Sequence, residues 1–203
     1  NASARLKILP LLIGRITIAT SAAIKNGKID GELTLKPDIR GQFTAENLEL
    51  ADIPLLASAT GGRIKGKTRI DISLNQTARG RPAEGSAKIQ IKPVELQGAR
   101  VGSMLLPDLD APELRGIIKI RAQSIFVDNL AIQGNGIYLR LNGNLPVSST
   151  SPLNLNLELI PTAEFLEKQK SLFLLMLPYQ TTPGSYRLPI GGSISSPQLA
   201  GSV

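Results

Sequence analysis

Apolar side chains occupy every second position in segment after segment of this sequence. Between residues 69 and 75, Ile70, Ile72 and Leu74 alternate with charged or polar residues, and between 153 and 159 every odd-numbered residue is leucine. Successive side chains of a β-strand point to opposite faces of its sheet, so this repeat places one set in a buried face and the other in solvent. The same alternation recurs at residues 28–36, 89–91, 118–120, 125–127 and 137–142. These segments predict half-buried antiparallel strands.

Glycine-containing turn signals separate the alternating segments. They are Asn26-Gly27, Asp30-Gly31, Gly61-Gly62, Gly80-Arg81-Pro82, Gly134-Asn135-Gly136 and Asn142-Gly143. Strands joined by such turns form hairpins, and a series of hairpins needs no crossover helices. The sequence therefore predicts a mainly all-β fold: one long, strongly bent antiparallel meander sheet, taco-like or a half-open barrel. No linker composition divides the chain, so residues 1–203 are expected to form a single domain.

One segment follows helical spacing instead. Between Pro161 and Pro178, apolar residues including Phe165 and Phe173 are separated by charged residues, which predicts one helix near residues 162–177. After it we expect a loop over 179–184 and two short strands, 186–190 and 193–195, around a glycine pair at 191–192.

The composition limits the chemistry that is available. The chain has no histidine and no cysteine, so imidazole-based triads, thiolate nucleophiles, zinc fingers and iron–sulfur clusters are excluded. Aromatic residues make up 3 %, which predicts an aliphatic core. The net charge of +7 permits an anionic partner, but basic residues are scattered. The densest group, Arg63, Lys65, Lys67 and Arg69, occupies alternate positions typical of the solvent face of a strand, so no nucleic-acid partner is expected.

Two motifs resemble functional sites, one for phosphate and one for calcium, but their sequence context does not support either function. Residues 61–68 match the phosphate-loop pattern G-x-x-x-x-G-K-[ST], yet an alternating strand follows where a phosphate loop requires a helix. We therefore expect a glycine turn before a strand with a basic face. Asp108 and Asp110 lie in a segment bracketed by prolines, where too few oxygen ligands surround them for calcium, and a loop is expected. No catalytic, cofactor-binding or metal-binding residues are predicted, and the chain is expected not to be an enzyme.

The aliphatic face of the predicted sheet has to be protected from water. The four leucines between 153 and 159 alone contribute roughly 6 to 12 kcal/mol on burial. Two alternatives follow. Either the sheet curls upon itself, or it leaves part of an apolar groove for lipid or for a partner protein.

Three stretches resemble a known family. They are residues 43–56 followed by 66–74, residues 134–159 leading into the predicted helix, and residues 184–199, which begin Gly-Ser-Tyr-Arg-Leu-Pro-Ile. The combination of aliphatic alternation with glycine and proline punctuation is similar to the type II secretion system protein N family, also called general secretion pathway protein N. The likeness spans about residues 29 to 199, and AsmA-like proteins share similar punctuation.

This resemblance implies a location and partners. It implies a periplasmic domain anchored in the bacterial inner membrane by an N-terminal helix, which residues 1–203 lack because the longest nearly apolar runs, 8–14 and 172–178, fall far short of about 20 residues. It also implies an accessory role in moving folded proteins across the outer membrane, with other type II secretion subunits as partners. AsmA-like relatives form a lengthwise-folded sheet with an apolar interior, and several are associated with lipid transport, so lipid is the alternative ligand. The family has no catalytic motif to carry over.

Overall fold

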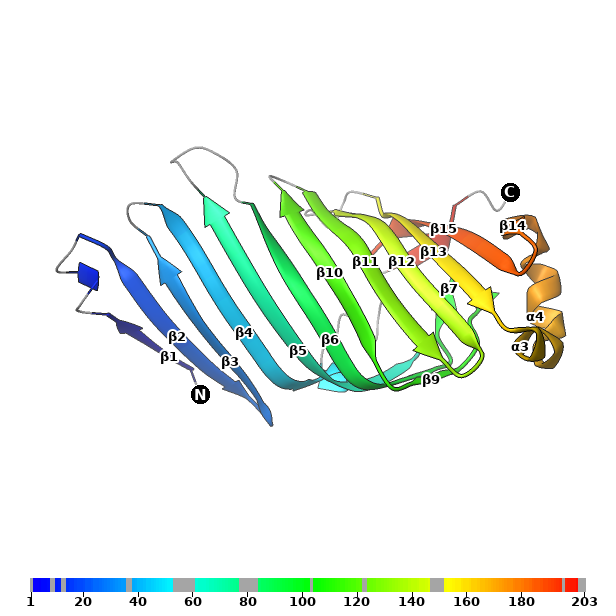
Figure 1. Cartoon of the computed structure of the whole chain (residues 1–203), viewed down its shortest axis with the longest axis horizontal. Coiled ribbons are helices and arrows are strands. Elements are labelled where there is room, and N and C mark those ends of the chain that lie inside the picture. Colours follow the sequence, from blue (N-terminus) through cyan, green and yellow to red (C-terminus); the bar gives the residue numbers. More distant parts are fainter. Residues whose placement is uncertain are drawn as a thin grey trace.

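A computed structural model describes residues 2–7, 10–11, 14–35, 38–52, 61–76, 84–102, 104–121, 124–146, 152–194 and 196–200. Its main feature is one 14-stranded antiparallel sheet (Figure 1). Along the sheet the order is β1 (Ala2–Leu6), β2 (Thr17–Ile24), β3 (Gly27–Thr34), β4 (Ile39–Glu49), β5 (Arg63–Gln76), β6 (Glu84–Gln97), β10 (Leu114–Arg121), β11 (Ser124–Gly134), β12 (Ile137–Pro146), β13 (Asn154–Pro161), β15 (Ser185–Ser193) and β14 (Gln180–Thr182). The predicted all-β meander is confirmed.

Strand pairing gathers the alternating apolar residues on one face. Residues that are directly opposite each other in neighbouring antiparallel strands share a face, and the register connects them into rows across the sheet. One row runs through Ala22, Ile29, Ala45, Ile70, Ile89, Gly116, Leu130, Leu141, Leu157 and Leu188. The sheet is open, because among the described strands β1 pairs only with β2 and the opposite end finishes at β14 and β16 (Ser196–Leu199).

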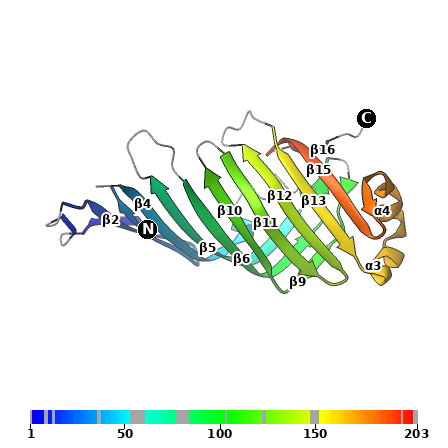
Figure 2. The same cartoon turned by 45° about the horizontal axis from the view of Figure 1, so that its top comes forward.

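An excursion from the sheet covers the C-terminal part of this apolar face. Residues 98–102 and 104–112, here called the strap, leave β6 and contain β7 (Arg100–Val101), β8 (Met104–Leu105) and β9 (Leu109–Ala111). β9 pairs with the end of β6, and at the far side the Gly102 amide donates to the Pro197 carbonyl at 3.0 Å. The strap therefore spans the sheet from β6 to β16, behind β10 to β13 (Figure 2).

The hydrophobic core lies between the strap and the C-terminal strands. Leu109 and Ala111 of the strap are buried there together with Val127, Leu157 and Leu159 of the sheet. All four leucines at 153, 155, 157 and 159 are buried, as the alternation predicts. Part of the chain thus supplies its own cover for this half of the sheet.

The predicted helix closes the end of this core, although it is two helices. α3 (Ala163–Lys168) and α4 (Lys170–Leu175) meet at Gln169, whose φ of −116° and ψ of 32° interrupt the helix, and the 3-10 turn η2 (Leu177–Tyr179) follows. The Thr162 hydroxyl caps α3 by accepting the Phe165 amide at 3.3 Å. Phe173 is buried against Tyr186, with ring centroids 5.0 Å apart.

Several predicted turns are correct and others are wrong. The β2–β3 hairpin turns at residues 25–26 and the β11–β12 hairpin at 135–136, whereas residues 80–82 lie outside the described residues. The turns predicted at Asp30-Gly31 and Asn142-Gly143 are wrong, because both pairs lie inside strands, β3 and β12.

Glycine occupies these two strand positions because a larger side chain would collide with a neighbouring strand. A Cβ on Gly31 would lie 2.2 Å from Phe43 Cδ1, and one on Gly143 would lie 2.2 Å from the Asn154 carbonyl oxygen.

The C-terminal prediction also needs correction. The glycine pair at 191–192 does not separate two strands, because β15 continues from Ser185 to Ser193. The second strand is β16, at Ser196–Leu199, and part of the predicted loop over 179–184 is strand β14. No described helix has the length and apolar character needed to cross a membrane.

Candidate functional site

The N-terminal half of the sheet carries an apolar surface that the strap does not reach. Its residues, here called the open apolar face, are Ile18, Ile29, Leu33, Phe43, Ile72 and Leu74, from β2 to β5. They continue the same rows that are buried farther along, since Ile72 is linked through Ala87, Ile118 and Val127 to the buried Leu155. Each is half-buried by its neighbours in the sheet, and none belongs to the core cluster. Among the described elements, β2, β3 and β4 pack mainly against adjacent strands.

The aromatic ring of Phe43 lies close to the backbone of the open apolar face. Its ring lies between Gly31, directly opposite on β3, and Gly41, two residues earlier on β4: Cβ atoms built on these glycines would approach ring carbons to 2.2 and 2.8 Å. With no side chain at either position, the ring lies down on the backbone. The open apolar face is thus an aliphatic surface that contains one aromatic ring lying close to the backbone.

The opposite face of the same strands is polar and internally paired. Arg69 bridges Glu46 at 3.0 Å and Asp71 at 3.2 Å, and the Thr44 hydroxyl donates to Asp71 at 3.1 Å. The hydrogen bond from Arg69, with a smaller contribution from Thr44, holds the pKa of Asp71 below its ordinary value. Further ion pairs on this face join Lys7 to Glu32, Lys28 to Asp30 and Lys119 to Asp128. These pairings are typical of a solvated face.

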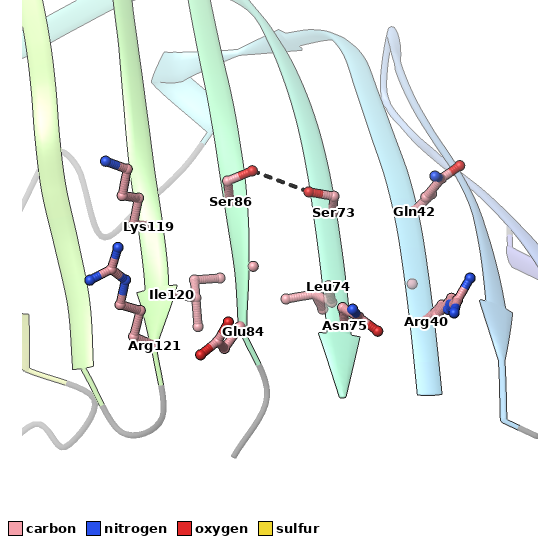
Figure 3. A pocket seen from close by; sticks show the side chains of 12 residues that line it. Arg40, Gln42, Ser73, Leu74, Asn75, Glu84, Ser86, Lys119, Ile120 and Arg121 are labelled. Atoms are coloured by element: carbon pink, nitrogen blue, oxygen red, sulfur yellow. Dashed lines mark hydrogen bonds between the residues drawn. The ribbon is translucent and has the colours of Figure 1, made fainter. Parts of the chain in front are cut away.

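A shallow hollow lies on this polar face near the ends of β4, β5, β6 and β10 (Figure 3). It has a volume of about 660 Å³, and its polar lining comprises Arg40, Gln42, Ser73, Asn75, Glu84, Ser86, Lys119 and Arg121. The hydroxyls of Ser73 and Ser86 are 3.1 Å apart and hydrogen-bond to each other. Arg40 lies 3.4 Å from Asp38, and Lys119 lies 2.8 Å from Asp128. The hollow offers hydrogen bonds, and the basic side chain directly opposite Ser86, that of Lys119, is ion-paired with Asp128.

A charged cluster that sequence reasoning missed joins β6 to β10. Glu113 contacts Arg115 at 2.7 Å and Lys92 at 3.0 Å, and it accepts a hydrogen bond from Gln90. The Arg115 hydrogen bond, supported by Gln90 and Lys92, lowers the pKa of Glu113 to about 2. The signal is not local, because these two segments come together only when β10 pairs with β6, which places Arg115 opposite Gln90. The cluster fastens two strands on the polar face.

The phosphate-loop lookalike does not have the geometry of a phosphate loop. β5 begins at Arg63, directly after the bend at the glycine pair, so the predicted glycine turn followed by a strand is confirmed and no helix follows the motif. Gly66 lies within this strand at φ +149°, where a Cβ would be 2.4 Å from the Pro93 carbonyl oxygen. Lys65 pairs with Glu95 at 3.0 Å. The four basic residues 63, 65, 67 and 69 are all exposed, as predicted.

The two aspartates of the strap are structural. Asp108 accepts the Gly98 amide at 2.9 Å, which closes the start of the strap, and Asp110 is an exposed residue of β9. The predicted loop is therefore a short strand at 109–111. Within the described ranges, no cluster of three or more aspartate, glutamate, histidine or cysteine side chains could hold a metal ion.

A second apolar surface lies at the other end of the molecule. Leu174 and Leu175 of α4 and Leu177 of η2 are 65 %, 70 % and 51 % exposed, while Phe173 and Met176 turn inward. These leucines and the open apolar face are well separated, since α4 and β2 lie at opposite ends of the sheet (Figure 1). These exposed leucines and the open apolar face lie apart from the self-paired polar face.

Comparison of the chain with protein-family models, with curated proteins and with solved structures found no match. The class that the geometry itself defines is an open antiparallel sheet whose apolar face is half covered by its own chain.

Proposed function

We propose that this protein is a non-enzymatic binding scaffold of the bacterial envelope, a periplasmic component of type II secretion held at the inner membrane. The open apolar face carries this proposal. It is a contiguous aliphatic surface on an ordered sheet, and no described part of the chain covers it. An apolar sheet face that is only half-buried can serve as a binding surface for proteins, membranes or ligands.

The assignment to type II secretion draws on the sequence resemblance. The stretches 43–56 and 66–74, which resemble secretion protein N, include parts of β4 and β5, the strands that carry Phe43, Ile72 and Leu74. The periplasmic location, the inner-membrane anchor and the other secretion subunits as partners come from the same resemblance. The resemblance to AsmA-like proteins implies a long antiparallel sheet with an apolar face, and the observed sheet supports that part of the proposal.

Two kinds of contact are available to a partner. The open apolar face accepts an apolar surface, and the outer edge of β1 offers backbone donors and acceptors to which another strand can add. Neither contact needs a catalytic group.

A matched pair of variants tests the proposal. Ile72 and Ser73 are neighbours in β5 on opposite faces, so Ile72→Glu charges the open apolar face and Ser73→Glu charges the polar face. In a pull-down against purified periplasmic domains of type II secretion subunits, we expect wild type and Ser73→Glu to capture a subunit and Ile72→Glu to lose it. Circular dichroism checks that both variants fold. Failure of wild type to enrich any subunit would contradict the secretion role.

A lipid-binding function is the second candidate, and the aliphatic make-up of the open apolar face favours it. Acyl chains could lie along the rows of isoleucine and leucine, with the ring of Phe43 beneath them. Native mass spectrometry of protein purified from cell envelopes would show co-purified lipid in wild type and Ser73→Glu, and its loss in Ile72→Glu. Subunit capture without bound lipid favours the scaffold, whereas lipid without subunit capture favours lipid transfer.

A further inference from the structure

The outer edge of β1 presents a regular set of backbone groups. In an antiparallel ladder, successive residues alternate between bonding to the neighbouring strand and pointing away from it. The Lys7 amide donates to the Thr17 carbonyl at 2.9 Å, which fixes this alternation. The odd-numbered residues of β1 bond to β2, so Ala2, Ala4 and Leu6 direct their N–H and C=O groups outward. All residues of β1 are exposed, and among the described strands β2 is its only partner.

The two ends of the sheet differ in how they are protected. At the C-terminal end the edge consists of two short strands, β14 with three residues and β16 with four, and Pro197 lies within β16. Short strands and prolines prevent further strand addition. β1 has five residues, no proline and three small side chains. Pairing between β1 and the C-terminal edge of another copy is therefore disfavoured, while pairing of β1 with itself is not obstructed.

We propose that β1 pairs with β1 of a second copy, antiparallel about a two-fold axis at Ala4. This inference rests on the proposed function, because both treat the outer edge of β1 as a contact site. Ala4 lies opposite Ala4 of the second copy, Ala2 opposite Leu6, and Ser3 opposite Arg5. Because the outward-pointing residues face one another, the register forms about six main-chain hydrogen bonds.

The side chains fit this register. Ala2, Ala4 and Leu6 lie in the apolar rows of the sheet, since they pair with Ala22, Thr20 and Ile18 of β2. Two-fold pairing therefore joins the open apolar faces of both copies into one continuous apolar surface. On the other face Arg5 meets a serine, so no like charges are opposed. The symmetry is closed, which yields a dimer and not a filament.

Cysteine trapping suits this contact. A pair of five-residue strands buries far less than the roughly 1,200–2,000 Å² of a stable interface, so the dimer forms transiently. The chain has no cysteine of its own. Positions 3 and 5 of the two copies form a non-hydrogen-bonded pair with Cα atoms about 4.5 Å apart, within the range of a disulfide.

The experiment uses Ser3→Cys and Arg5→Cys as two separate full-length variants, one carrying a size tag. After mild oxidation and non-reducing electrophoresis, we expect a covalent heterodimer at least about tenfold more abundant in the mixture than homodimers in either variant alone. Ser171→Cys, exposed on α4, sets the background from random collision. Equal cross-linking in the mixture and in the single variants, or none at any concentration, would overturn the proposal.

A proline variant adds an independent check. Ala4→Pro removes an outward N–H but keeps the β1–β2 hydrogen bonds, so it should abolish the heterodimer while circular dichroism stays unchanged. Retained cross-linking in this variant would overturn the proposed register. Because the assay contains only this protein, its result is separate from the pull-down. A subunit captured by a strictly monomeric protein would leave the proposed function standing without the dimer.

Discussion

Individual glycines in this sheet have two roles that the sequence cannot separate. Gly136 lies in a hairpin turn at φ +83°, as glycine in a turn signal predicts. Gly31 and Gly143 have the same neighbours as turn glycines, an aspartate and an asparagine, yet both lie within strands. Their role is set by atoms from other strands, the Phe43 ring and the Asn154 carbonyl. That information exists only after the strands have paired.

Substitution at Gly143 tests the close-approach role. Gly143→Ala places a Cβ against a backbone oxygen at a φ of +129°, so we expect it to destabilise the fold by about 2–4 kcal/mol. Gly191→Ala is the matched control in β15, because its nearest neighbour would be the Ala200 side chain at 3.6 Å, and it should stay within about 1 kcal/mol of wild type. Urea unfolding measures both. Equal effects would show that space at Gly143 is not limiting.

The carboxylate of Glu113 makes the free energy of unfolding depend on pH in the acidic range. Its pKa is lowered to about 2 in the folded protein, below the ordinary value of 4.5, so between these values the unfolded chain binds more protons. Stability should therefore be fully present above about pH 4.5 and fall as the pH drops toward 2. Urea unfolding across this range should show a shallower pH dependence for Glu113→Gln than for wild type. An unchanged pH dependence in Glu113→Gln would contradict this assignment.

At the level of elements, the sequence predicts strands well and their cover poorly. The alternation of side chains is a property of each strand, so β3, β5, β12 and β13 could be located from residue type alone. The strap could not be located in this way. Its strands are short, as β9 (Leu109–Ala111) shows with three residues, and such a strand is too short to display a period. The break at Gln169 within the helical segment also has no counterpart in the spacing of apolar residues.

The candidate site shows the same limit. The sequence left two alternatives open for the apolar face, a sheet curled upon itself or a groove for lipid or a partner protein. The sheet stays open, and the strap and helices cover its C-terminal part instead. Leu33 and Leu159 both lie in segments where apolar and polar residues alternate, so the sequence pattern does not distinguish them. The strap and helices cover only Leu159. Which half stays open is decided by where residues 98–112 cross, a tertiary property.

Two leucine truncations compare the halves directly. Leu159 is 0 % exposed in the core, so Leu159→Ala should cost about 2–5 kcal/mol, because both transfer and cavity terms apply. Leu33 is half-buried on the open apolar face, where water fills the space left by truncation, and Leu33→Ala should cost about 1 kcal/mol. The midpoints of urea unfolding report the difference. Similar losses would mean that the open apolar face is covered in solution.

The whole molecule is therefore uneven in its stability. Strands β11 to β13 and β15 share a core with the strap and α4, whereas β1 to β3 are held by pairing to neighbouring strands and by exposed ion pairs, which contribute little. Opening the N-terminal strands exposes surface that is already half-exposed, while opening β13 exposes its buried leucines. Local unfolding should begin at β1 and proceed toward β5.

Hydrogen exchange measures this gradient strand by strand. We expect amides of β2 and β3 to exchange at least about 100-fold faster than those of β13, whose leucines are buried. Adding a ligand or partner that covers the open apolar face should slow exchange in β2 to β5 while leaving β13 unchanged, because only the first group gains cover. The Ile72→Glu variant should lose this protection and Ser73→Glu should keep it. Uniform protection along the sheet would contradict a half-covered structure, and with it the idea that the N-terminal half is stabilised by what it binds.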